Sequence, residues 1–177
     1  MNETQEPLQE QQNEAIEENS VDPEKLQKYI DQLKSEQNLV MGTLGGLTGA
    51  ILGALVWAGI TVATNFQIGY MAVGIGYLVG MGMRIMGKGI TSIFGYVGAI
   101  LALLGCLLGN FFSQIYGYLP EESIFDIQTL TAINYSLVLQ WMWQTTDFIT
   151  LIFYALATYE GYRFSFRVSF PSVIEKN

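Results

Sequence analysis

The sequence predicts an all-α polytopic membrane protein with four transmembrane helices and one further interfacial or re-entrant helix. Its apolar segments have the length that a hydrocarbon layer about 30 Å thick requires. Only 14% of the residues are charged, and the mean hydropathy is +0.30. All glycines except Gly161 lie within residues 42–117, where they recur at helical spacing. This clustering indicates close packing between helix backbones.

The charged residues are concentrated near the start of the chain. Residues 1–38 hold ten acidic residues and three lysines, and the whole chain has a net charge of −8. Residues 1–21 are rich in Glu and Gln and bury too little apolar surface to offset the entropy of ordering, so we expect a disordered acidic cytoplasmic tail. Because phosphates repel such a tail, we expect no nucleic-acid partner and no docking of the tail on an anionic lipid surface.

The residue types that most enzymes and metal sites need are missing. The chain has no histidine, which is the commonest general base and transition-metal ligand, and one cysteine, Cys106, which has no partner for an intrachain disulfide. The glycines at residues 74–76 fall within an apolar helix and not between a strand and a helix, as a nucleotide-binding loop would require. We therefore expect no enzymatic activity, no cofactor and no metal.

Residues 22–38 are predicted to form a juxtamembrane helix. Asp22 suits the N-cap, and Pro23 suits the first helical position. Leu26 and Ile30 give the helix one apolar face. This face fits a helix that lies on the membrane surface or runs into the first span, and also fits a partner-docking helix.

Residues 39–166 are predicted to form the membrane domain, followed by a cytoplasmic tail at 167–177. The expected spans are residues 40–64, 67–84, 91–113 and 146–162, with the interfacial or re-entrant helix at 124–144. An alternative reading starts the last span near Asn134, which would place Asp147 close to the middle of the membrane.

Small residues recur every three or four positions along the first three spans. In lipid, such rows let helix backbones approach closely and gain dispersion contacts. They fit packing within the chain and packing against a second copy; matching rows on successive spans favour packing within the chain. The predicted helix-packing residues are Gly42, Gly45, Gly46, Gly49, Gly53, Gly76, Gly80, Gly95, Gly98, Gly105 and Gly109.

Basic residues set the expected orientation. Arg84 and Lys88 lie in one short connection, and Arg163 and Arg167 follow the last span. The positive-inside rule makes both segments cytoplasmic, and four spans then place both termini in the cytoplasm.

A few polar residues in or beside the spans are candidates for a function. Asp147, Asn110 and Gln67 fit a polar path, but Asp147 equally fits an exposed N-cap, and the amides equally fit hydrogen bonds between helices. Arg84 and Glu160 are predicted to form an ion pair at the membrane boundary.

Three segments carry a resemblance to a known group of proteins. Residues 67–76 (QIGYMAVGIG), the run at 103–110 and residues 159–166 (YEGYRFSF) resemble a family of small bacterial multispan inner-membrane proteins whose activity is unassigned. The resemblance covers residues 45–167. It implies residence in the bacterial plasma membrane and four spans, and it implies no catalytic or binding residues.

Two functions fit these observations. The first is a noncatalytic integral membrane protein that serves as a scaffold or as a subunit of a membrane complex, with the lipid bilayer and either a second copy or another membrane protein as partners. The alternative is a small oligomeric channel or permease subunit with a polar path near Asp147.

Overall fold

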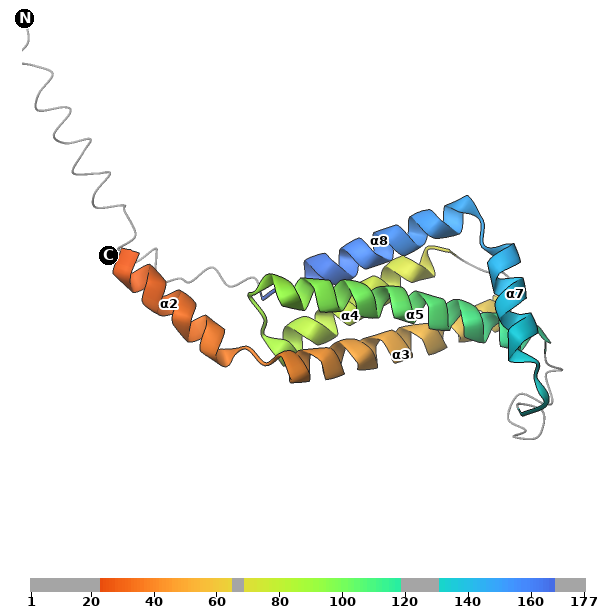
Figure 1. Ribbon diagram of the computed structural model, residues 1–177, viewed down its shortest axis with the longest axis horizontal. Helices are drawn as coiled ribbons and strands as arrows, with labels where there is room; N and C mark the ends of the chain where they lie inside the picture. Colours follow the sequence, from red (N-terminus) through yellow and green to blue (C-terminus); the bar gives the residue numbers. More distant parts are fainter. Residues whose placement is uncertain (1–22, 65–68, 119–130, 168–177) are drawn as a thin grey trace, which may run out of the picture. The chain divides into compact units, whose positions relative to one another are not determined.

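The computed structural model describes residues 23–64, 69–118 and 131–167, and every regular element in these ranges is a helix (Figure 1). The all-α prediction is therefore confirmed for this part of the chain. The predicted disordered tail at 1–21, Gln67, residues 124–130 of the predicted interfacial helix and residues 168–177 lie outside the described residues. The helices are α2 (Pro23–Glu36), α3 (Leu39–Thr64), α4 (Met71–Gly87), α5 (Ser92–Tyr118), α7 (Tyr135–Thr145) and α8 (Phe148–Phe164).

The chain forms two compact units, one containing α2 up to Ser35 and one comprising Glu36–Val168. In the first unit, α2 starts at Pro23, close to the predicted start, and none of its residues is buried. Asp31 accepts a hydrogen bond from Gln27 at 3.2 Å and lies 4.0 Å from the Lys34 ammonium group, so its contacts are those of a solvated helix face.

The second unit is a bundle of α3, α4, α5 and α8, with α7 attached at one end. The helices α4 and α5 lie between α3 and α8, and α7 contacts α5 (Figure 1). We call the end at which α3 and α5 begin the N-end of the bundle, and the opposite end, near α7, the α7 end. The helices α4 and α8 run parallel, because Gly76 lies against Ala157 and Gly80 against Phe164.

The described helix bounds differ from the predicted spans by a few residues, except that α5 extends further. One alternative is wrong: no single helix runs from Asn134 through the last apolar segment. The chain is extended at Thr146 and Asp147, so α7 and α8 are separate helices. Asp147 therefore lies in front of α8 and not within a helix.

Among the described helices, α3 and α5 are long and apolar enough to cross a membrane, and α4 is apolar but shorter. The helix α8 is also short: its 17 residues extend about 25 Å at about 1.5 Å per residue.

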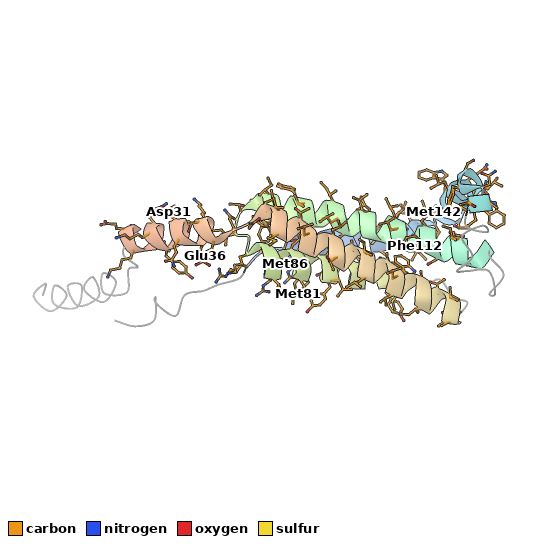
Figure 2. The ribbon with its side chains drawn as sticks, turned by 90° about the horizontal axis from the view of Figure 1, so that it is seen from below. Asp31, Glu36, Met81, Met86, Phe112 and Met142 are labelled. Atoms are coloured by element: carbon orange, nitrogen blue, oxygen red, sulfur yellow. The ribbon has the colours of Figure 1, made fainter. Side chains whose placement is uncertain are left out.

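The helix α3 turns its small residues toward the bundle and its large aliphatic residues outward. On α3, Ala54 is 0% exposed, whereas the neighbouring Leu52 and Leu55 are both 54% exposed. The buried residues of this helix are Gly42, Gly45, Gly46, Gly49, Ala50, Gly53, Ala54, Trp57 and Ala58. Figure 2 shows apolar side chains projecting from the outside of the helices, including Met81 and Met86 of α4. A water-soluble bundle has the opposite arrangement.

Candidate functional site

Glycine contacts bring α3 and α4 together. A Cβ atom at Gly45 would collide with the carbonyl oxygen of Gly82 and lie 2.8 Å from its carbonyl carbon. At Gly49, a Cβ would lie 2.5 Å from the carbonyl oxygen of Leu78. Backbone faces backbone at both positions, so these residues can only be glycine without moving a helix.

The same kind of contact joins α8 to α4 and α5. A Cβ at Gly76 would collide with the carbonyl oxygen of Ala157, and one at Gly98 would lie 2.6 Å from the carbonyl oxygen of Gly161. The remaining predicted packing glycines, whose added Cβ atoms would meet side chains or backbone atoms from elsewhere in the chain, are Gly42, Gly46, Gly53, Gly80, Gly95, Gly105 and Gly109. The structure thus places all the predicted packing glycines at contacts within the chain.

Other glycines make close contacts although they fall outside the predicted packing set: Gly69, Gly82, Gly87, Gly89 and Gly161. The contact of Gly82 with Gly45 depends on which helices pair, which the spacing of residues within one helix does not show. At Gly59 and Gly74, a Cβ would meet nothing within 4 Å, so packing within the chain does not account for these two glycines.

Buried polar side chains gather in the half of the bundle toward α7. Asn110 is 2% exposed, and its Nδ2 donates a 2.9 Å hydrogen bond to the hydroxyl of Tyr154. Ser113 donates to the carbonyl of Gly109 at 2.8 Å and lies 3.4 Å from the hydroxyl of Thr61. These bonds join α5 to α8 and to α3. They agree with the alternative in which the amide of Asn110 forms a hydrogen bond between helices.

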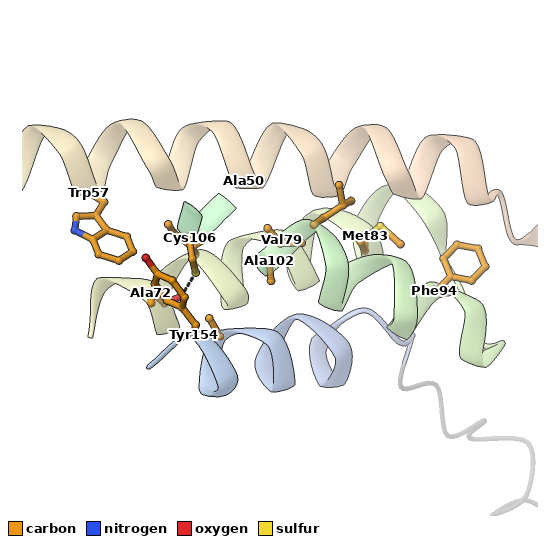
Figure 3. Close-up of a cluster of buried hydrophobic side chains, with 12 residues drawn as sticks. Ala50, Trp57, Ala72, Val79, Met83, Phe94, Ala102, Cys106 and Tyr154 are labelled. Carbon is orange, nitrogen blue, oxygen red and sulfur yellow. Dashed lines mark hydrogen bonds between the residues drawn. The ribbon is translucent and has the colours of Figure 1, made fainter. Parts of the chain in front are cut away.

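Trp57 adds an unsatisfied polar atom to this region. The indole ring is 1% exposed and lies against Gly109, and its Nε1 has no hydrogen-bond partner among the described residues. Figure 3 shows Trp57 and Tyr154 in the same part of the buried cluster, with Phe94 at the opposite end. Neither Trp57 nor Tyr154 was predicted as a site residue, because an aromatic residue in an apolar run reads as ordinary packing.

Asp147 is the N-cap of α8. Its Oδ1 accepts hydrogen bonds from the Thr150 hydroxyl at 2.6 Å and from the Thr150 amide at 2.8 Å. These two bonds lower the pKa of Asp147 below its ordinary value. The structure gives Asp147 and Asn110 different partners, so it does not join them into one polar path.

A cavity of about 180 Å³ lies beside this N-cap. It is open to the outside, and a hydrogen bond of 3.1 Å from Gln114 to the hydroxyl of Thr145 ties α5 to α7 next to it. The lining residues are Trp57, Gly69, Thr145, Asp147, Ile149, Thr150 and Phe153. A carboxylate between aromatic walls suits a small polar or cationic guest.

Toward the N-end, the core is mostly apolar, and the buried polar side chain there among the described residues is Ser165, whose hydroxyl donates to the Gly161 carbonyl. Ile75, Val79, Met83 and Phe94 are each no more than 1% exposed and fill the space between the helices. In the described part of the bundle, the polar cluster therefore does not continue through to the N-end.

Arg84 and Glu160 do not form the predicted ion pair. The ion pairs among the described residues are Lys34 with Asp31 and Arg167 with Glu36, the latter at 2.8 Å. The guanidinium group of Arg163 lies 6.0 Å from the ring centre of Phe164. The sequence pattern could not fix this pairing, because it depends on how far α8 is displaced along α4.

The N-end is held by bonds between three chain segments. Gln37 Oε1 accepts hydrogen bonds from the Ile90 amide and the Thr91 hydroxyl. The Asn38 amide donates to the Gly87 carbonyl at 2.9 Å, and the Arg167 amide donates to the Gly89 carbonyl at 2.8 Å. The start of α3, the α4–α5 connection and the end of α8 therefore lie at the same end of the bundle.

No group of three or more His, Cys, Asp or Glu residues that could hold a metal ion occurs in the described ranges. Comparisons with protein-family models, with curated proteins and with solved structures found no match for this chain.

Proposed function

We propose that this protein is a noncatalytic integral membrane protein that crosses the bilayer four times and serves as a scaffold or subunit of a membrane complex. The observation that carries the proposal is the packing of α3, whose glycine and alanine residues face the bundle while its leucine, isoleucine and valine residues are exposed. In water, so much exposed aliphatic surface would drive aggregation; in lipid, it is the surface that faces the acyl chains.

The contacts within the bundle support four crossings. The helices α4 and α8 are joined to α3 and α5 by backbone contacts along most of their length, so a bilayer that surrounds α3 and α5 also surrounds α4 and α8. At the α7 end, Trp143 is 81% exposed. Such a residue settles at the depth of the lipid headgroups, which fits α7 as an interfacial helix.

The basic residues support an orientation with the N-end in the cytoplasm. Arg84, Lys88, Arg163 and Arg167 all belong to the segments that lie toward this end. By the positive-inside rule, the start of α3 and the end of α8 then both face the cytoplasm. The proposed compartment is the bacterial inner membrane, on the resemblance of the sequence alone.

Accessibility of single cysteines tests the topology. In a Cys106→Ala background, Lys88→Cys and Thr145→Cys are placed at opposite ends of the bundle. A membrane-impermeant maleimide applied to intact cells is expected to label Thr145→Cys and to label Lys88→Cys only after the membrane is opened. Equal labelling of both in intact cells, or recovery of the chain without detergent from the aqueous fraction, would contradict the proposal.

The cavity beside Asp147 favours a second candidate, a channel or permease subunit that works as an oligomer. The buried groups Asn110, Tyr154 and Trp57 lie in the same half of the bundle as the cavity, but the core toward the N-end is mostly apolar. A path along one chain would require that core to open. In liposomes, this candidate predicts flux that Asp147→Asn abolishes; flux that is absent, or unchanged by the substitution, speaks for the scaffold.

A further inference from the structure

Glu160 of α8 lies well inside the length of the bundle and not at its boundary. On α8, Ala157 lies against Gly76, and Gly161 lies against Ala102. At about 1.5 Å of rise per residue, the path along α5 from Ala102 back to Ser92 is about 15 Å, and the path along α4 from Gly76 to its end is about 16 Å. With the contact between Gly80 and Phe164 included, the three contacts place Glu160 about 12–17 Å from the N-end on the same scale.

The side chain of Glu160 occupies the outer edge of the α4–α8 contact. Ala157 and Phe164, one turn away on either side, both contact α4, whereas Leu156 is 44% exposed. Glu160 itself is half-buried. Across the contact, the Tyr77 ring packs edge-on against Phe164, with ring centres 5.1 Å apart, and remains largely exposed. We call Tyr77, Leu156 and Glu160 the α4–α8 edge.

The carboxylate of Glu160 has no hydrogen bond and no ion pair with any described residue. The nearest basic residue along α8, Arg163, lies one turn closer to the N-end beside Phe164. A carboxylate in water needs no partner. At this depth in a bilayer, an unpaired acidic group is costly and is expected to face a polar partner.

A second feature of α4 points to the same partner. Gly74 lies one turn from Tyr77 on α4, and a Cβ there would meet nothing within 4 Å. An open glycine on the outside of a membrane helix lets another helix backbone approach closely. No described helix of this chain packs against Gly74, so the position is open to a helix from another protein.

Resting on the proposed membrane location, we propose that the α4–α8 edge binds a transmembrane helix of a different protein, which presents a basic or amide side chain to Glu160. Lipid chains offer no donor to a carboxylate. A second copy in the same orientation would bring its own Glu160 to the same depth, and its basic residues Arg84 and Arg163 lie nearer the N-end. Charge complementarity thus favours a partner of different sequence that places a basic or amide side chain at the depth of Glu160.

Site-specific photocrosslinking in native membranes tests the proposal with the full chain. A benzophenone amino acid replaces Leu156 at the α4–α8 edge or, as the matched control, Leu52 on α3, which is similarly exposed. Leu156 is expected to give a discrete protein adduct that Leu52 does not. The adduct should fall at least tenfold with Glu160→Leu and persist with Glu160→Gln, which keeps a hydrogen-bonding oxygen. Mass spectrometry should place the crosslink on a helix of another protein within one turn of Lys, Arg, Asn or Gln.

The proposal would be overturned by an adduct with a second copy of this chain, by adducts with lipid only, by a protein adduct that Glu160→Leu leaves unchanged, or by the absence of any adduct. Because Glu160 makes no hydrogen bond or ion pair with a described residue, Glu160→Leu is expected to unfold at the same detergent concentration as the parent, which separates a lost partner from a lost fold. Carbonate extraction of the same membranes distinguishes failure of the proposed membrane location from failure of partner binding at the α4–α8 edge. A chain that leaves the membrane refutes the proposed function as well, whereas an integrated chain without the adduct refutes the α4–α8 edge alone.

Discussion

Alanine at Gly45 is expected to destabilise the bundle, although alanine favours helices. The added Cβ would lie 2.8 Å from the carbonyl carbon of Gly82 and 2.8 Å from Sδ of Met86. The Met86 side chain can move aside, but the Gly82 backbone can yield only if α3 and α4 separate locally by roughly 1 Å to reach ordinary contact distance. Overpacking of this kind costs about 1–3 kcal/mol.

The matched control is Gly59→Ala on the same helix, where the new Cβ meets nothing within 4 Å. Both substitutions gain about 1 kcal/mol of helix propensity, so this contribution cancels in the comparison. Gly45→Ala should therefore be less stable than Gly59→Ala by about 1–3 kcal/mol. The free energy of unfolding is measured in mixed micelles as the mole fraction of sodium dodecyl sulfate rises, with far-ultraviolet circular dichroism as the signal. Equal midpoints for the two variants would refute the close α3–α4 contact.

Further substitutions test other contacts in the bundle. Tyr154→Phe removes the oxygen that accepts a hydrogen bond from Asn110, so the free energy of unfolding should fall by about 0.5–1.5 kcal/mol; an unchanged value would contradict this hydrogen bond. Gly98→Leu should drive α5 from α8, because even a Cβ there meets the Gly161 carbonyl, and folded protein recovered by size-exclusion chromatography at the parent's yield would contradict the contact. Cys106, which is 0% exposed, should react with maleimide only after unfolding; rapid reaction of the folded protein would show that the core is open. Asp147→Ala should lower the unfolding midpoint and Asp147→Asn should restore most of it, because asparagine is also a good N-cap; equal midpoints would remove the N-cap role.

Local features of the sequence were sufficient for the helices themselves. The lengths of the apolar runs place α3, α4, α5 and α8 within a few residues of most of their observed ends, because hydrophobic runs and breaks are local properties of the chain. Asp147 could be recognised as an N-cap alternative from its position before an apolar run, since capping needs only the next few residues.

The partners across the bundle could not be obtained in the same way. Spacing shows that Asn110 shares a helix with Gly109, but nothing in the spacing connects it to Tyr154 on α8. The predicted Arg84–Glu160 pair failed for the same reason. The distance between two side chains on different helices depends on the displacement of one helix along the other, which many contacts set together.

What the sequence alone determined is that this chain forms apolar helices with rows of small residues, because periodicity and composition act within one helix. Only the tertiary structure decided which rows meet. It pairs Gly45 with Gly82, leaves Gly59 and Gly74 open, and sets Glu160 about 12–17 Å from the N-end by the helical rise. The physical reason is that a helix fixes the direction of its own side chains, whereas the depth and the neighbours of each side chain follow from the packing of all the helices against one another.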